Sequence, residues 1–96
     1  MEPMIRVVVL YDEEPDSQEY AQHAELCARV PGGTFRHGQV FGAPMGEPQH
    51  RYYAEWEFPD RETFKAAAQS DEFMATGKDA RDRGFPRPTI EFASVG

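Results

Sequence analysis

The chain has 96 residues, a length that predicts a single domain, residues 1–96, with one small core. Its formal charge of −7 and sequence pI of about 4.8 disfavour nucleic acid and anionic membrane surfaces as partners, because both repel an acidic protein. A single cysteine excludes an intrachain disulfide and cannot form a zinc site by itself, so we expect no metal site.

The N-terminal segment MEPMIRVVVL lacks the basic flank, long apolar region and small-residue cleavage site of a secretory signal. No apolar run approaches the roughly 20 residues that a membrane-spanning helix needs. We therefore expect a soluble, cytoplasmic protein with no membrane partner.

The first predicted element is a strand over residues 5–10, because the run IRVVVL is rich in β-branched side chains. Both faces of this run are mainly apolar, which is typical of a strand that is covered on both sides. The segment YDEEPD that follows is polar and contains a proline, so it predicts a loop.

A helix is predicted next, capped by Asp16 or Ser17 and extending to about Val30. The segment Pro31-Gly32-Gly33 should end it, because proline cannot continue a helix and glycine accepts left-handed dihedrals. At about 100° per residue, one arc of this helix is largely apolar, with a histidine near its centre. The residues of this arc are Tyr20, His23, Ala24, Leu26, Cys27 and Val30.

Two further strands are predicted, over residues 34–42 and 50–58, with a loop between them that contains two prolines. The second of these strands has the clearest alternation in the chain. One of its faces carries Tyr52, Ala54, Trp56 and Phe58.

Asp60 is well placed to cap a helix over residues 61–69, which has a narrow apolar face. That face consists of Phe64, Ala67 and Ala68. We expect one further turn at residues 70–73, a stop at Gly77, and a polar connection up to a final strand over residues 89–95.

The order β-α-β-β-α-β predicts a ferredoxin-like α+β fold, in which two helices cover one face of a four-stranded antiparallel sheet. Tyr53 and the two apolar faces of the first strand argue against water on the other face, so we expect a homodimer through the sheet faces. Glu55 and Glu57 on that face should form charge pairs with nearby arginines. The candidates are Arg6, Arg36 and Arg51.

These residues are similar, over nearly the whole chain, to the EthD-like proteins of the dimeric α/β barrel superfamily. The resemblance begins at MIRVVVLY, continues through the histidine helix and its PGG terminus, and is strongest in YYAEWEFPDRETFKAAAQSDE. His23 and Leu26 fit the spacing of the family's first helix, with Glu25 in place of an expected proline. An alignment shifted by about one turn would instead place Ala28 at the family's histidine position.

The resemblance implies a dimeric α/β barrel with a pocket between the sheet and the helices of each subunit. EthD-like proteins include an accessory protein of ether degradation, and related barrels include lactone isomerases, cofactor-free monooxygenases and heme-binding enzymes. The implied function is therefore catabolism or tailoring of a small organic molecule, for example an aromatic, polyketide-like or lactone compound.

His23 is the candidate acid or base of such a pocket, because an imidazole with a pKa near 6.5 can move a proton at neutral pH. Tyr20 lies one helical turn earlier and could assist it, and we expect the other wall residues to bind substrate. The expected substrate-binding residues are Tyr52, Trp56, Cys27 and Phe64. We expect no cofactor, since the sequence offers no second feature for heme beside a lone histidine.

Three interpretations remain open from the sequence. The chain is a cofactor-free isomerase, cyclase or oxygenase-like enzyme, a non-catalytic accessory or ligand-binding protein beside a monooxygenase, or an assembly module without a ligand. A cavity that touches His23 favours the enzyme, whereas a filled core in which this histidine bonds to the backbone favours the accessory role.

Overall fold

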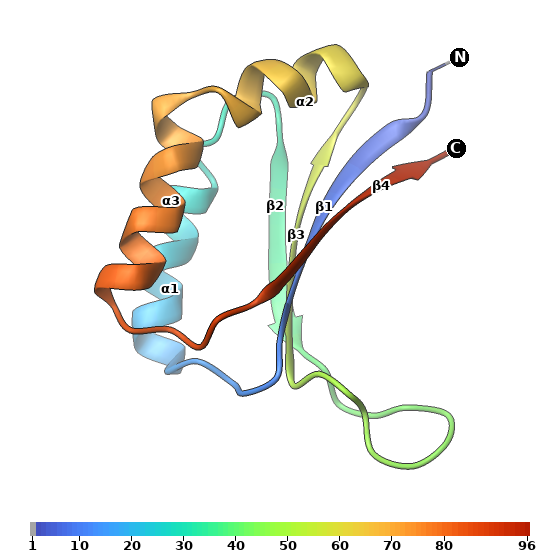
Figure 1. The fold of residues 1–96 in the computed structure, drawn as a ribbon, viewed down its shortest axis with the longest axis vertical. Helices are drawn as coiled ribbons and strands as arrows, with labels where there is room; N and C mark the ends of the chain where they lie inside the picture. The colour runs from blue at the N-terminus through green and yellow to red at the C-terminus, as the bar shows by residue number, and fades with distance from the viewer. Residues whose placement is uncertain (1) are drawn as a thin grey trace.

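A four-stranded antiparallel sheet in the order β2-β3-β1-β4 forms the centre of the molecule in the computed structural model, which describes residues 2–96 (Figure 1). The strands are β1 (Met4–Tyr11), β2 (Thr34–Gln39), β3 (Tyr52–Phe58) and β4 (Thr89–Val95). The helices are α1 (Ser17–Cys27), α2 (Arg61–Ala68) and α3 (Asp71–Asp82). The predicted ferredoxin-like arrangement is confirmed.

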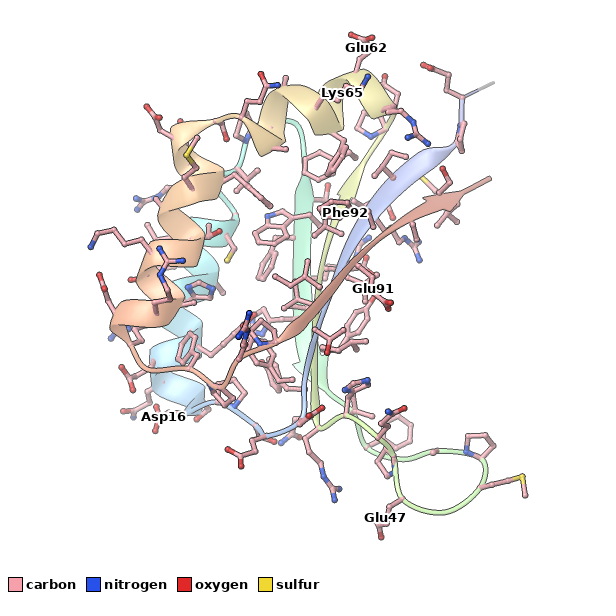
Figure 2. All side chains as sticks on the ribbon, in the orientation of Figure 1. Asp16, Glu47, Glu62, Lys65, Glu91 and Phe92 are labelled. Atoms are coloured by element: carbon pink, nitrogen blue, oxygen red, sulfur yellow. The ribbon has the colours of Figure 1, made fainter. Side chains whose placement is uncertain are left out.

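All three helices lie on the same side of the sheet, with α1 and α3 packed beside each other and α2 at one end (Figure 1). Glu62 and Lys65 on α2 point away from the sheet (Figure 2). Among the helices of residues 2–96, none is long and apolar enough to cross a bilayer. Within the same part of the chain, the opposite face of the sheet carries no helix.

Strand β1 is central because it pairs with β3 on one side and with β4 on the other. Val7, for example, lies opposite Trp56 in β3 and Phe92 in β4. The alternation of β1 directs every second side chain into the core between sheet and helices. These buried side chains are Ile5, Val7, Val9 and Tyr11.

Helix α1 begins as predicted but ends three residues early. The Asp16 carboxylate accepts hydrogen bonds from the backbone N–H groups of residues 18 and 19, both at 3.0 Å. After Cys27 the chain tightens, with N–H groups donating to carbonyls three residues back at Arg29 and Val30. The cause is Pro31, because a residue that precedes proline is disfavoured in the α conformation.

Helix α3 corrects the sequence prediction, since it passes through Gly77 and continues to Asp82. Ser70 caps its start by accepting a hydrogen bond from Phe73 N–H at 3.2 Å, and Gly84, with a φ of +71°, follows its end. A glycine within a helix costs only about 1 kcal/mol relative to alanine, which the packing of α3 against α1 outweighs. The segment expected to be a connection is therefore largely helical.

The loop over residues 40–51 projects from the sheet and contains Glu47 (Figure 2). It begins after Gln39 and ends before Tyr52, so β2 and β3 are both shorter than predicted. Arg51 forms an ion pair with Glu47 at 3.5 Å and does not reach the glutamates of β3.

A charged cluster occupies the face of the sheet opposite the helices. Glu55, only 5% exposed, accepts hydrogen bonds from Tyr53 Oη and from Arg36 Nη2, the latter at 2.7 Å. Glu57 accepts from the guanidinium groups of Arg36 at 2.9 Å and Arg6 at 3.1 Å. The predicted charge pairs are thus confirmed for two of the three candidate arginines.

Replacing Gly32 by alanine should destabilise the fold more than the same change at Gly46. Both glycines have positive φ, +78° and +71°, which costs a substituted residue about 1–2 kcal/mol. A Cβ at position 32 would also collide with the Thr63 side chain, whereas position 46 faces open space. We expect G32A to lower the free energy of unfolding by about 1–3 kcal/mol more than G46A in urea titrations. Equal losses would contradict this packing.

Candidate functional site

A cleft of about 1030 Å³ lies between the sheet and the helices, lined by residues of all four strands, of the three helices and of the segment after α3. This volume is at the upper end of the roughly 300–1,000 Å³ of small-molecule sites. Most of the lining is apolar or aromatic, including Val7, Val9, Phe35 and Trp56. The sheet provides these side chains because alternate residues of its strands face the helices.

His23 lies on the wall of this cleft and is only 4% exposed. Its Nδ1 is 2.8 Å from Oδ2 of Asp79, which α3 presents to α1. A carboxylate can only accept, so Nδ1 carries the proton and Nε2 keeps its lone pair when the imidazole is neutral. The structure thus gives the histidine a defined tautomer and orientation.

Asp79 is held in its ionised form. Burial by itself would raise its pKa, but hydrogen bonds from His23 and Arg83 outweigh burial and lower the pKa below its usual value. The Arg83 Nε donates to the same oxygen at 2.8 Å, and its Nη1 donates to Gln22 Oε1 on α1 at 2.9 Å. One carboxylate therefore joins the two helices and orients the imidazole.

Cys27 stands one helical turn after His23, with its Sγ 3.4 Å from Nε2. Burial, and then the nearby charge of Asp79, raises the pKa of this thiol to about 12. The group is therefore a neutral thiol at pH 7, which donates weakly to Nε2 and is a poor nucleophile. Asp79 supplies the orienting third group that the sequence did not reveal, but the thiol stays unactivated.

Tyr20 is also on the cleft wall, with its ring centroid 5.2 Å from that of His23. Burial, followed by the neighbouring Tyr11, raises the pKa of Tyr20 well above its usual value. The side chain is therefore a neutral phenol that can donate a hydrogen bond but cannot act as a base at neutral pH.

Trp56 lines the cleft and has a second contact that fixes its position. Its Nε1 donates to the carbonyl of Cys27 at 2.8 Å, which ties the end of α1 to β3. The indole therefore forms a rigid part of the wall, as expected for a side chain that would position a ligand.

Tyr52 and Phe64 do not belong to the cleft lining formed by residues 2–96. The Tyr52 hydroxyl is 2.6 Å from Nδ1 of His37, at the end of the sheet. Phe64 packs edge-on between Phe58 and Phe92, at centroid distances of 5.7 and 5.1 Å. Both aromatic rings therefore pack beside the cleft and do not form its wall.

Sequence reasoning missed Asp79, Arg83 and Phe85. The ring of Phe85 lies 5.2 Å from His23 and 5.4 Å from Tyr20, centroid to centroid. All three were placed in a polar connection because Gly77 was interpreted as a helix stop. A helical signal was present, since residues 78–83 contain two pairs of opposite charges at the i,i+4 spacing.

A metal centre is not formed by the side chains described. Between residues 2 and 96, the structure contains no group of three His, Cys, Asp or Glu side chains placed to hold an ion. The two histidines other than His23 have separate partners. His37 contacts Tyr52, and His50 Nδ1 is 3.0 Å from Asp12 Oδ1 at the surface.

Several solved structures have the same fold as this chain. No family model and no curated protein matches the sequence. An EthD (ethyl tert-butyl ether degradation) family protein from Bacillus halodurans superposes with a TM-score of 0.75 and 28% identity, covering 94% of this chain and 96% of the other. The chain is similar to an EthD family protein in fold and, at 28% identity, in sequence.

Two further structures resemble the EthD-like chain in fold. A dimeric ferredoxin-like protein of unknown function from Jannaschia has a TM-score of 0.71 and 17% identity, with coverage of 96% and 99%. A hydroxynitrile lyase from Passiflora edulis has a TM-score of 0.71 and 12% identity, with coverage of 99% and 94%. At these identities the two structures support the architecture alone.

Asp79→Asn should reduce stability at neutral pH and should matter less in acid. The folded-state pKa of Asp79 is lowered, so its stabilisation is complete above the unfolded pKa and disappears as pH falls through the folded value. We expect a loss of about 1–3 kcal/mol at pH 7, as for hydrogen bonds to a charged group. Urea titrations should show the difference from wild type shrinking between about pH 5 and pH 2. A difference independent of pH would contradict an ionised Asp79.

Proposed function

We propose that this EthD-like chain is an enzyme that binds a small organic molecule in the cleft and moves a proton on it without a cofactor. The observation that carries the proposal is the His23–Asp79 pair on the wall of an apolar cleft of about 1030 Å³. A titratable ring with a carboxylate partner, facing space for a ligand, is the arrangement expected of a general base. His23 bonds to a side chain rather than to the backbone, which favours the enzyme over a structural histidine.

The proposed chemistry uses Nε2 of His23. Because Nδ1–H donates to Asp79, Nε2 is the basic nitrogen, and in the resting state it accepts from the Cys27 thiol at 3.4 Å. A substrate C–H or O–H group would take the place of the thiol and transfer its proton to Nε2. The Asp79 carboxylate then stabilises the imidazolium until the proton returns to another atom of the substrate. Such a base typically contributes about 10²–10⁴-fold to a rate.

Tyr20 would assist by donating its phenolic proton in a hydrogen bond to an oxygen that becomes negative as the proton leaves. Its raised pKa supports this role, since the phenol remains neutral throughout. Trp56 and Cys27 would contact the substrate from the wall. Tyr52 and Phe64 would affect the substrate only indirectly, by fixing the positions of neighbouring aromatic rings, because neither lines the cleft.

The aromatic wall favours a flat or cyclic apolar substrate, such as an aromatic, polyketide-like or lactone compound. The likeness to an EthD family protein and, in fold, to a hydroxynitrile lyase supports tailoring or degradation of a small molecule in a broad sense. The proposed location is the cytoplasm, where the unpaired thiol of Cys27 would remain reduced.

A second copy of the chain would cover the open face of the sheet. Val8 and Leu10 are half-buried on that face, beside the almost fully buried carboxylate of Glu55. Solvent is a poor cover for apolar side chains that share one surface. The dimeric state of the structurally similar Jannaschia protein supports a homodimer of the same kind.

The competing function is a non-catalytic ligand-binding or accessory protein beside a monooxygenase. One observation favours it. His23 is almost fully buried, and both of its nitrogens already have partners, in Asp79 and Cys27. If no substrate group displaces the thiol, the imidazole only holds α1 against α3, and the cleft serves to bind a ligand.

Proton abstraction can be measured with 5-nitrobenzisoxazole, a neutral aromatic that opens to a coloured phenolate when a base removes its ring proton. We expect the wild type to accelerate opening and H23A to lose about 10²-fold of that acceleration, with D79N intermediate. C27A should lower the rate far less than H23A does, since the thiol contacts the substrate but is not the base.

The matched control is H50A, which removes a half-buried imidazole outside the cleft lining that is also paired with an aspartate. This variant should retain the wild-type rate. Equal losses in H23A and H50A, or no acceleration by the wild type, would contradict the proposed chemistry. Binding of the probe without acceleration would favour the accessory function.

Leu10→Lys should convert the proposed dimer into a monomer, because it places a charge among the half-buried apolar side chains of the open face. The matched control is Met74→Lys, which changes an exposed apolar side chain on the helical side. Sedimentation velocity should give a dimer for the wild type and for M74K, and a monomer for L10K. A monomeric wild type, or a dimeric L10K, would contradict the proposed interface.

A further inference from the structure

The charge of the cleft wall is opposite to the charge of the chain. The sequence has 17 acidic and 10 basic residues, yet the lining of the cleft includes two arginines, Arg81 and Arg87, and no aspartate or glutamate of residues 2–96. Asp79 is next to this wall but stands behind His23, where it is already bound to Arg83. The cleft is therefore a locally basic region of an acidic protein.

Helix α3 shows that Arg81 is an exception among its basic residues. Lys78 pairs with Asp82 at 2.7 Å, and Arg83 pairs with Asp79 at 2.8 Å, each at the i,i+4 spacing that favours such pairs. Arg81 makes no ion pair or side-chain hydrogen bond with residues 2–96.

The residues one turn from Arg81 are Gly77 and Phe85, and both line the cleft. The guanidinium folds back along the helix, so that a Cβ placed on Gly77 would lie 3.8 Å from Nη1 of Arg81. The guanidinium of Arg81 therefore lies beside the part of the cleft wall that Gly77 forms.

Arg87 reaches the cleft from the segment that joins α3 to β4. It lies between Pro86 and Pro88, which also line the cleft, and these two prolines restrict the backbone on both sides of the arginine. Like Arg81, it has no ion-pair partner among residues 2–96. Two guanidinium groups without carboxylate partners thus stand beside one apolar space.

We propose that the cleft binds an organic carboxylate, with the carboxylate held by Arg81 and Arg87 and the apolar body against Trp56 and Phe35. The planar guanidinium fork matches a carboxylate, and such pairs are stronger than neutral hydrogen bonds. The net charge of −7 repels anions from the rest of the surface, so the two arginines select where an anion binds. The apolar body would then lie along the same wall that carries His23.

This inference rests on the proposed use of the cleft as a substrate site, but it is tested separately from the proton chemistry. Three probes of the same shape are compared by isothermal titration calorimetry, namely 2-naphthoate, neutral 2-naphthamide and cationic 2-naphthylmethylamine. We expect 2-naphthoate to bind at least tenfold more tightly than 2-naphthamide, and the amine to bind most weakly. The preference should decrease with added salt.

The variants R81Q and R87Q should each weaken naphthoate binding about five- to tenfold, as expected for a lost charge-assisted contact. The double variant should bind naphthoate and naphthamide equally, because the apolar wall is unchanged. Both arginines are exposed, so the variants should fold, and thermal unfolding checks this. R29Q is the matched control, since Arg29 is an exposed arginine outside the cleft lining, and it should bind naphthoate as the wild type does.

Equal affinity for naphthoate and naphthamide in the wild type would overturn the inference, as would an unchanged preference in the double variant. Tightest binding of the amine, or no saturable binding of any probe, would overturn it too. None of these results depends on the neutral benzisoxazole assay. The absence of a carboxylate preference would therefore not contradict the role of His23 as a base. The absence of acceleration in the benzisoxazole assay would not contradict binding of a carboxylate by the two arginines.

Discussion

The hydrogen bond between His23 Nδ1 and Asp79 Oδ2, 2.8 Å long, joins helices α1 and α3 and determines what the space beside them can do. A buried imidazole without a partner would be costly, and a buried carboxylate without partners more so. Here the imidazole and the carboxylate bond to each other, and Arg83 provides a second hydrogen bond to the carboxylate, at the contact between α1 and α3. The same contact leaves Nε2, the nitrogen that carries no proton in the neutral ring, directed at the Cys27 thiol.

The aromatic surroundings of this contact explain why its groups behave differently. Desolvation raises the pKa of the Tyr20 phenol and brings that of the Cys27 thiol to about 12, so both stay neutral. The same burial acts on Asp79, but the hydrogen bonds from His23 and Arg83 outweigh it and keep the carboxylate charged. One environment therefore contains two neutral donors, a fixed anion and an imidazole whose Nδ1 proton is held by that anion.

The charged side chains are arranged differently on the two faces of the sheet. On the helical side, charge is concentrated behind His23 and beside the cleft, and the wall between is apolar. On the other side, Glu55 and Glu57 form a network with Arg6 and Arg36 that is already partly desolvated in one subunit. A covering copy would strengthen these pairs by excluding water, since salt bridges weaken with solvent exposure.

Local patterns were enough to predict the order of the four strands with α1 and α2, the helix cap at Asp60, and the inward position of His23. They narrowed the cap of α1 to Asp16 or Ser17, and the structure shows that it is Asp16. Alternation and helical periodicity are properties of short segments, so they can be read along the chain. Gly77 misled the same reasoning, because its helix propensity is overridden by the packing of α3 on α1.

The partner of His23 was decided by tertiary structure alone, since Asp79 is 56 residues away in sequence. The cleft, and the division of the aromatic side chains into wall and core, likewise depend on how far the helices stand from the sheet. Residues on one face of a strand share a direction, but only the packed arrangement decides which of them, such as Trp56 and not Tyr52, border open space. The periodicity of the sequence thus determined which side chains point towards the core. The packing of distant segments against one another determined which partners those side chains contact and which of them line the cleft.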